Sequence, residues 1–364
     1  MIETEPTSTH DMRDATLLMF APIELSKLSI REGPTMQRKV RARIPTLAAT
    51  LCLVLLGAAI GCKSRPAASG LFPVTLQTDW YPQPEMGGFY EAQLLGFYKA
   101  QGLDVTIAPG GPFVVGEQQV ATGAAQFAMG SSDLVLVDVS RGLPLVAVAA
   151  TMQQDPQGVM VHAESPVHTF ADLEGRTIAA KPGSIWLQYL VKRYGLKNIR
   201  EIPATYSVAN FLEDPGYIQQ CFITSEPYFA RKGGAEVRTL LINATGYQPY
   251  RVFFTSRQFI ADHPKVVQKF VNASIQGWHD YLADPAEVDR ELSRLNPAMS
   301  PEQMRFSIDT LKAGHFIDGD GTPDSHLGHF TAERWNTIYR QLVDLKVVAK
   351  PIDPATAYTM RFNP

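Results

Sequence analysis

The residues best suited to chemistry in this sequence follow strand-like stretches, and they include an unusual pair of aromatics. Within LQTDWYPQPEMGGFYEAQLLGFYKAQGLDVTI, residues 76–107, Trp80 and Tyr81 stand in a proline- and glycine-rich break between a strand and a helix. A plain turn seldom uses two large aromatic side chains, whereas aromatic rings stack on planar ligands at low entropy cost. We therefore interpret this break as part of a platform for a ligand.

Other candidate residues also follow predicted strands or begin predicted helices. In open α/β sheets, ligands bind beyond the carboxyl ends of the strands, and helix N-termini attract anions and lone pairs. The set is rich in aromatic, hydroxyl and amide groups and poor in His and Cys, which favours holding a small planar or anionic molecule over transforming one. The predicted ligand-binding residues are Asp79, Trp80, Tyr81, Gly87, Gly88, Tyr90, Ser131, Ser132, Asp133, Gln153, Lys181, Gly183, Ser184, Trp186, Tyr206, Glu226 and Tyr228.

Several of these residues also have a purely structural interpretation. Trp80 could pack between two lobes of the protein. Glu226 could cap its own helix or pair with Lys232. Ser131 and Ser132 could serve as N-caps of the helix that follows them, since hydroxyl groups are favoured there.

The sequence offers little support for catalysis or metal binding. Cys221 lies in an apolar run and is expected to be an inert buried thiol. Lys181 could be an ordinary surface lysine. His326 and His329 have no cysteine or carboxylate cluster around them, and no G-x-S-x-G motif is present. We therefore predict no catalytic residue, no metal and no cofactor.

The elements that would position the candidates alternate between strands and helices, which favours an α/β fold with a largely parallel sheet. Apolar runs predict strands at 74–78, 103–107, 125–130, 144–151, 158–163, 176–180 and 250–256. Helical spacing of apolar residues predicts helices at 89–101, 116–122, 131–142 and 185–195. From residue 260 onward helices dominate, with long amphipathic segments at 264–285 and 331–348.

The first part of the chain is typical of an export signal. A basic cluster at 38–43 precedes the apolar run Ile44 to Ile60, and Cys62 follows small residues. This arrangement resembles a lipoprotein processing box, in which Cys62 becomes the lipid-bearing first residue. An uncleaved anchor and cleaved soluble secretion are the alternatives. We predict a signal peptide at 36–61, a tether at 62–70, and residues 1–35 either untranslated, with Met36 as the start, or disordered.

The net charge of the chain argues against nucleic acid as a partner. Its 364 residues carry a formal net charge of -3, so no broad basic surface points to nucleic acid. The signal predicts an exported protein, held on the periplasmic side of the cell membrane by the lipid at Cys62.

Several blocks of sequence together resemble a known family: the 76–107 stretch, FAMGSSD, LEGRTIAAKPGS, SEPYFARKGG and the two helical segments after residue 260. They are similar to the periplasmic solute-binding proteins of ABC importers, in the branch for thiamine-pyrimidine precursors, nitrate and sulfonates. The resemblance runs from about Leu71 to the end. It implies a type II periplasmic binding protein: two α/β lobes, two crossover strands and a helical C-terminal tail. The first lobe would comprise 71–160 and 250–364, and the second 161–249.

The resemblance also implies roles and partners. Trp80 would match the stacking aromatic, Glu226 the carboxylate that accepts hydrogen bonds from an exocyclic amine, and residues 181–184 the loop for the polar or anionic end of the ligand. Met86 stands where many relatives carry His, which suggests a less polar ligand there. The ligand would be a thiamine-pyrimidine precursor or another small heterocycle such as a flavin, passed by a monomeric protein to a permease and its ATPase.

The family also includes an enzyme, the eukaryotic pyrimidine synthase. Ser132 and Leu136 stand where that enzyme has its cofactor lysine and its sacrificial histidine, so the synthase reaction is not expected here. The remaining alternatives are a sensor module that hands its ligand to a receptor and an enzyme on the same fold, such as a desulfinase using Cys221.

Overall fold

The structure of the protein is a computed structural model that describes residues 70–363, all within the compact unit Arg65–Pro364. The basic cluster, the apolar run and Cys62 lie outside the described residues. Between residues 70 and 363, no helix has both the length and the apolar composition needed to cross a membrane.

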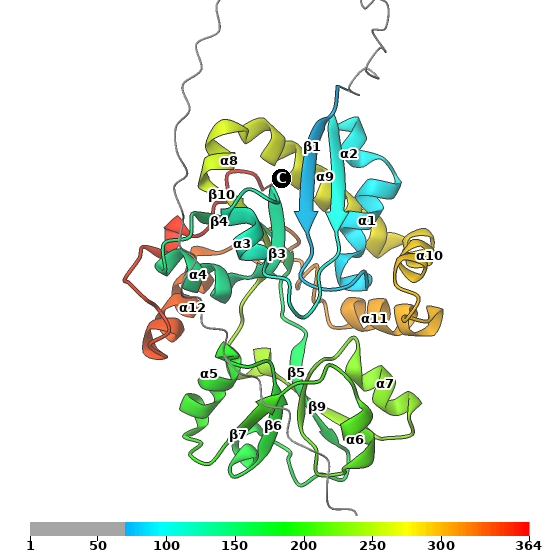
Figure 1. Cartoon of the computed structure of the whole chain (residues 1–364), viewed down its shortest axis with the longest axis vertical. Coiled ribbons are helices and arrows are strands. Elements are labelled where there is room, and N and C mark those ends of the chain that lie inside the picture. Colours follow the sequence, from blue (N-terminus) through cyan, green and yellow to red (C-terminus); the bar gives the residue numbers. More distant parts are fainter. Residues whose placement is uncertain (1–69, 364) are drawn as a thin grey trace, which may run out of the picture. The chain divides into compact units, whose positions relative to one another are not determined.

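A first sheet of five strands has the order β2-β1-β3-β10-β4 (Figure 1). The strands are β1 (Phe72–Gln77), β2 (Leu103–Ala108), β3 (Phe127–Ser131), β4 (Leu145–Met152) and β10 (Arg251–Ser256). Every residue of β3 and β4 is buried, because these short apolar runs are covered on both faces. β1 is parallel to β2 and β3, whereas β10 is antiparallel to β3 and β4.

A second sheet of five strands has the order β7-β6-β8-β5-β9. Its strands are β5 (Gln157–His162), β6 (Thr177–Ala180), β7 (Arg200–Pro203), β8 (Gln219–Phe222) and β9 (Val237–Leu241). The chain passes from β4 to β5 and returns from β9 to β10, which divides it into a first and a second lobe, each built on one sheet. The lobe boundaries at 160 and 249 stay a prediction, and the first falls inside β5.

The expectation of largely parallel sheets is only partly met. β6 is parallel to β7 and β8, but β5 is antiparallel to β8 and β9. The physical reason is that the chain crosses between the two lobes twice, once on the way out and once on the way back. β10 returns from the second lobe, so it begins beside the carboxyl ends of β3 and β4 and runs antiparallel to both.

The helix predicted at 89–101 is two helices, α1 (Gly87–Leu94) and α2 (Phe97–Ala100). Gly96 separates them with a left-handed φ of 76°, which glycine adopts at little steric cost. The apolar face predicted for one continuous helix is therefore wrong at the break, where Leu94 and Leu95 are exposed.

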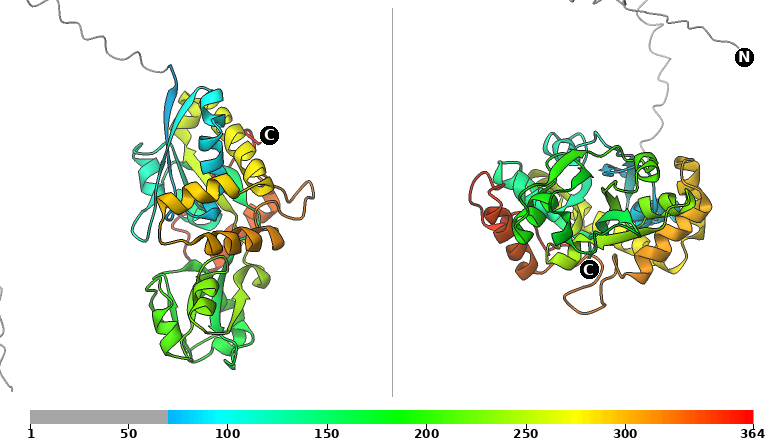
Figure 2. Two further views of the ribbon diagram at one scale, coloured as in Figure 1. Left: turned by 90° about the vertical axis from the view of Figure 1, so that its right-hand side faces the viewer. Right: turned by 90° about the horizontal axis from the view of Figure 1, so that it is seen from below.

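The other helices are the α-helices α3 (Gly116–Ala121), α4 (Ser132–Ser140), α5 (Ile185–Tyr194), α6 (Ala209–Glu213), α7 (Glu226–Lys232), α8 (Arg257–Asp262), α9 (Pro264–Ala283), α10 (Ala286–Leu295), α11 (Pro301–Ala313) and α12 (Ala332–Asp344), with short 3₁₀ turns η1 (Pro84–Met86), η2 (Phe170–Leu173), η3 (Ile242–Thr245) and η4 (Pro354–Thr356). Figure 2 shows the yellow and orange helices α9 to α11 beside the cyan α1 and α2.

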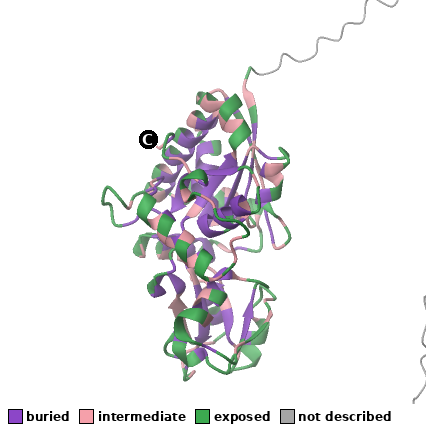
Figure 3. Ribbon diagram, turned by 90° about the vertical axis from the view of Figure 1, so that its left-hand side faces the viewer, coloured by how far each residue is buried: buried purple, intermediate pink, exposed green. Residues whose placement is uncertain are grey.

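The core of the first lobe is built around aromatic side chains from the sheet and from α9. The rings of Phe127 in β3 and Phe270 in α9 stack with centroids 4.0 Å apart, and Phe89, Trp278 and Phe270 are fully buried. In Figure 3 the strands and the inner helix faces are the buried parts. This packing holds the strand ends, and thus the loops that carry the candidate residues, in fixed positions.

Candidate functional site

A pocket lies between the two lobes, where the strand ends of both sheets meet. Its volume is about 360 Å³, within the range of small-molecule sites. β1 and β3 of the first sheet and β6 and β8 of the second all end at it. Of the residues predicted to bind ligand, its lining contains Asp79, Trp80, Ser131, Asp133, Lys181, Gly183, Ser184, Trp186, Tyr206 and Glu226.

Aromatic rings from both lobes meet at one side of the pocket. Trp80 follows β1 and is half-buried, and its ring centroid lies 5.1 Å from that of Tyr206 in the second lobe. Tyr206 has a φ of 56°, which is strained for a bulky residue and often marks a functional position. Tyr81 packs edge-on against Trp80 but is 48% exposed and does not line the pocket.

A partly buried arginine organises the charges on the first-lobe side. Arg251 at the start of β10 forms an ion pair with Asp79 and lies over the ring of Phe222, 5.8 Å from its centroid. Asp155 accepts a hydrogen bond from the backbone of Gln157, and burial raises its pKa to about 6. The pocket therefore holds a cation already surrounded by carboxylates.

Two glutamates, one from each lobe, line the pocket. Glu85 in η1 accepts a hydrogen bond from the hydroxyl of Thr224 in the second lobe. Glu226, at the start of α7, accepts one from the backbone N–H of Phe222 at 2.8 Å. The Thr224 carbonyl accepts from Ser307 in α11 at 2.6 Å, so the loop before Glu226 is held from the first lobe.

Burial raises the pKa of Glu226 to about 7, and the nearby Glu85 adds to the effect. Below pH about 4.5 the side chain is neutral in both folded and unfolded chains and contributes nothing. Between pH 4.5 and 7 only the unfolded chain loses the proton, so stability falls as pH rises, by at most about 1.4 kcal/mol per pH unit. Glu226→Gln should match the wild type in urea unfolding at pH 4.5 and exceed it at pH 8.

Glu213→Gln at the exposed end of α6 is the matched control, and should leave the pH profile of stability unchanged. An equal effect of Glu226→Gln at both pH values would contradict the raised pKa.

The loop 181–184 is less suited to an anion than expected. The backbone N–H of Lys181 donates to the side chain of Gln220 at 2.6 Å, and that of Gly183 donates to Glu201 at 3.1 Å. The Ser184 hydroxyl donates to the Lys181 carbonyl. Two backbone N–H groups and one hydroxyl that could bind an anion are thus already engaged within the protein.

Other predicted ligand-binding residues lie outside the lining and have structural roles. Gly87 and Gly88 let α1 approach α9, since a Cβ on either would overlap Tyr281 or Trp278. Tyr90 is buried in the core of the first lobe. Tyr228 packs against Phe306 of α11.

Two further predicted residues also serve the fold. The Ser132 hydroxyl accepts from the backbone N–H of Tyr250 at 2.9 Å, and Gln153 donates to the carbonyls of His326 and His329. Neither Ser131 nor Ser132 caps α4, because the N-cap residue Ser131 makes no side-chain bond to the helix.

The sequence interpretation missed several polar residues that line the pocket: Glu85, Glu117, Asp155, Tyr247 and Arg251. Tyr247 donates to Asp133 at 2.5 Å. Arg251 was missed because only the ends of strands were considered, whereas a strand that returns from the other lobe begins at the same edge. Glu117 lies in the first turn of α3, and a search of all helix starts would have found it.

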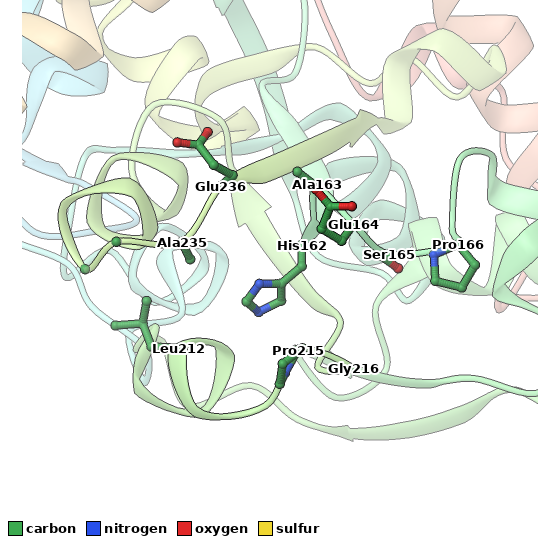
Figure 4. Close-up of a pocket in the computed structure, with 12 residues that line it drawn as sticks. His162, Ala163, Glu164, Ser165, Pro166, Leu212, Pro215, Gly216, Ala235 and Glu236 are labelled. Carbon is green, nitrogen blue, oxygen red and sulfur yellow. The ribbon is translucent and has the colours of Figure 1, made fainter.

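A second hollow of about 570 Å³ lies on the second lobe alone (Figure 4). His162 stands in its centre, but the ring stacks on Phe211 at 4.0 Å and its Nε2 bonds the Phe211 carbonyl. Glu164 and Glu236 at its rim are exposed. The hollow is a wide surface depression with no converging polar groups, so the interlobe pocket is the better candidate site. Within residues 70–363, no group of three or more His, Cys, Asp or Glu side chains is placed to hold a metal ion.

Comparison with known proteins agrees with this architecture. The family described as NMT1/THI5 like matches residues 83–288. The riboflavin-binding protein RibY of Chloroflexus aurantiacus is 24% identical over 347 residues, covering 89% of this chain and 99% of that protein. The 4-amino-5-hydroxymethyl-2-methylpyrimidine phosphate synthase THI11 of Saccharomyces cerevisiae is 26% identical over 246 residues, covering 62% and 72%.

Among solved structures, the periplasmic aliphatic sulphonate binding protein SsuA from Escherichia coli superposes with a TM-score of 0.62 at 16% identity, covering 78% of this chain and 91% of that one. This likeness confirms the predicted periplasmic binding protein fold.

Proposed function

Since the chain belongs to the NMT1/THI5-like family, we propose that it is the solute-binding protein of an ABC importer and captures a small aromatic or nitrogen-heterocyclic solute between its lobes. The observation that carries this proposal is the interlobe pocket, in which Trp80 from one lobe and Tyr206 from the other offer aromatic rings to one space. A ligand held by both would favour closure of the lobes.

Relatives suggest two classes of ligand. RibY is named for riboflavin, and the yeast synthase for a pyrimidine. Both are planar heterocycles that an indole ring can stack upon. A thiamine-pyrimidine precursor and a flavin are therefore the first candidates, and Met86 in the pocket wall adds an apolar surface for either.

The experiment that tests this function is to release bound small molecules from the purified protein by denaturation and identify them by mass spectrometry. Thermal unfolding with pyrimidines, flavins and sulfonates follows, because a ligand that binds only the folded state raises its stability. Absence of any released molecule, and of any stabilisation, would contradict a solute-binding function.

The rest of the transport proposal rests on the export signal and on the family resemblance. We propose that Cys62 carries the lipid, that the protein is exported, monomeric and held at the membrane, and that it delivers its solute to a permease and ATPase. A sensor module would share all of these features except the permease, so loss of solute uptake in a deletion strain distinguishes the two.

The named synthases among the relatives keep an enzyme as the second candidate. The two positions that match the synthase's lysine and histidine carry no such groups. Ser132 accepts a hydrogen bond from the backbone of Tyr250, and Leu136 is buried. Cys221 is a buried free cysteine among Met160, Phe211 and Ala230, and burial raises the pKa of its thiol, which disfavours the nucleophilic thiolate.

Cys221→Ser is expected to leave solute affinity within about twofold, because the thiol does not line the pocket. The variant should lose about 1–2 kcal/mol of stability, since a hydroxyl is more costly to bury than a thiol. Calorimetric titration and urea unfolding measure the two effects. Loss of solute turnover, if any turnover exists, would support the enzyme instead.

A further inference from the structure

The interlobe pocket carries a marked excess of negative side chains. The carboxylates that line it are Asp79, Glu85, Glu117, Asp133, Asp155 and Glu226. Among the described residues, the cations in the lining are Lys181 and Arg251, and Arg251 is already paired with Asp79. A site with this balance repels anions and attracts positive charge or N–H donors.

Two of these carboxylates are buried and accept few hydrogen bonds from the protein. Glu85 is 4% exposed, and its Oε2 has no hydrogen-bond partner among the described residues. Glu117 is 9% exposed, and within residues 70–363 its carboxylate accepts a hydrogen bond from its own backbone N–H and from no other residue. Buried polar groups are normally paired, so the unpaired Oε2 of Glu85 points to a partner that is not part of the chain.

Glu117 sits in the wall of the pocket because its neighbour in β3 has no side chain. A Cβ at Gly130 would lie 3.2 Å from Oε1 of Glu117, and both residues line the pocket. Burial is the main cause that raises the pKa of Glu85 and of Glu117. A positive or donating group nearby would remove that penalty.

Fewer groups in the lining lack a hydrogen-bond acceptor. Trp186 lines the pocket, and its indole Nε1 is buried without an acceptor. The N–H groups of Lys181 and Gly183 are already engaged, as described above. The donors left in the lining thus include the Trp186 indole and the Lys181 ammonium, against six carboxylates. This balance fits a ring nitrogen or carbonyl at one edge of a solute and N–H groups at others.

We propose that this pocket recognises a cationic or N–H-rich planar solute and rejects anions, with Glu85 and Glu117 of the first lobe and Glu226 of the second as its acceptors. The inference rests on the proposed solute-binding function and narrows its substrate class. It sets the chain apart from binders of sulfonate or phosphate groups, although it shares their fold.

Matched pairs of probes test the charge preference. The full chain is titrated at pH 7 with 4-amino-5-hydroxymethyl-2-methylpyrimidine and its phosphate ester, with riboflavin and its phosphate ester, and with methanesulfonate. In each pair we expect the phosphate ester to bind at least tenfold more weakly, and methanesulfonate not to bind. The charge of any molecule released from the purified protein supplies a second, independent reading.

Two variants then test the acceptors. Glu117→Gln and Glu85→Gln keep the shape of the side chain but remove the charge. Each should weaken the uncharged pyrimidine about tenfold and reduce its advantage over the phosphate ester, whereas a merely structural role would weaken both probes equally. Glu164→Gln, on the surface hollow, is the control. Thermal unfolding shows which of the two variants fold, and one folded variant is enough to test the acceptor role.

The outcomes separate the two proposals. A phosphate ester or sulfonate that binds as well as its uncharged counterpart, or that is released from the purified protein, overturns the charge preference and leaves solute binding standing. An unchanged preference in both variants removes Glu85 and Glu117 from the site. No released molecule and no binding by any probe would overturn solute binding and this inference together.

Discussion

Gly277→Val is expected to lower the free energy of unfolding by about 3 kcal/mol or more. A Cβ at this position would lie 2.2 Å from the carbonyl oxygen of Gly88 and 2.7 Å from the backbone nitrogen of Ala92. Both atoms belong to the backbone of α1 and cannot rotate away. The two helices would have to separate, which opens the aromatic core beneath them.

Glycines on both helices allow α1 and α9 to pack closely against each other. Gly87 and Gly88 on α1 receive the rings of Tyr281 and Trp278, while Gly277 on α9 receives the backbone of α1. Because η1 with Glu85 leads directly into α1, a displaced α1 also moves a wall of the pocket. Loss of stability in the variant should therefore be accompanied by weaker solute binding.

Urea unfolding followed by circular dichroism measures the effect. Gln276→Ala, on the exposed face of the same helix, is the control and should change stability by less than about 0.5 kcal/mol. If Gly277→Val unfolds at the same urea concentration as the wild type, the close helix contact is wrong.

The sequence predicted all five strands of the first sheet but missed β7 and β9 of the second, and it did not predict how the strands pair. Short apolar runs such as 144–151 identified buried strands, because a strand covered on both faces has no polar alternation. The direction of β5 and β10 did not follow from local pattern, since it depends on where the chain crosses between lobes. The break at Gly96 was missed because one glycine inside a helical pattern does not by itself reveal a left-handed conformation.

The same distinction applies to the candidate site. Residues directly after strands, such as Asp79 and Glu226, were found because the ends of parallel strands meet at one edge. Gly87 and Gly88 shared the same stretch, yet they serve helix packing. Arg251 and Glu117 join the site through long-range pairing and a helix start, which sequence spacing does not show. The excess of carboxylates could therefore be recognised only in three dimensions.

Trp80→Ala is expected to weaken solute binding by about 1–3 kcal/mol, or roughly 5- to 150-fold. Trp80 lines the pocket and reaches the ring of Tyr206 in the second lobe. Removing the indole takes away a stacking surface and a contact between the lobes. The side chain is only half-buried, so the variant should still fold.

Calorimetric titration with the solute identified from the purified protein measures this loss. Trp80→Phe restores an aromatic ring and should recover part of the affinity. Tyr81→Ala is the matched control, because Tyr81 is an adjacent aromatic that lies outside the lining and is 48% exposed; it should bind solute about as well as the wild type. Equal affinities for Trp80→Ala and the wild type would remove the indole from the site, and a larger loss in Tyr81→Ala would shift the binding surface toward the rim.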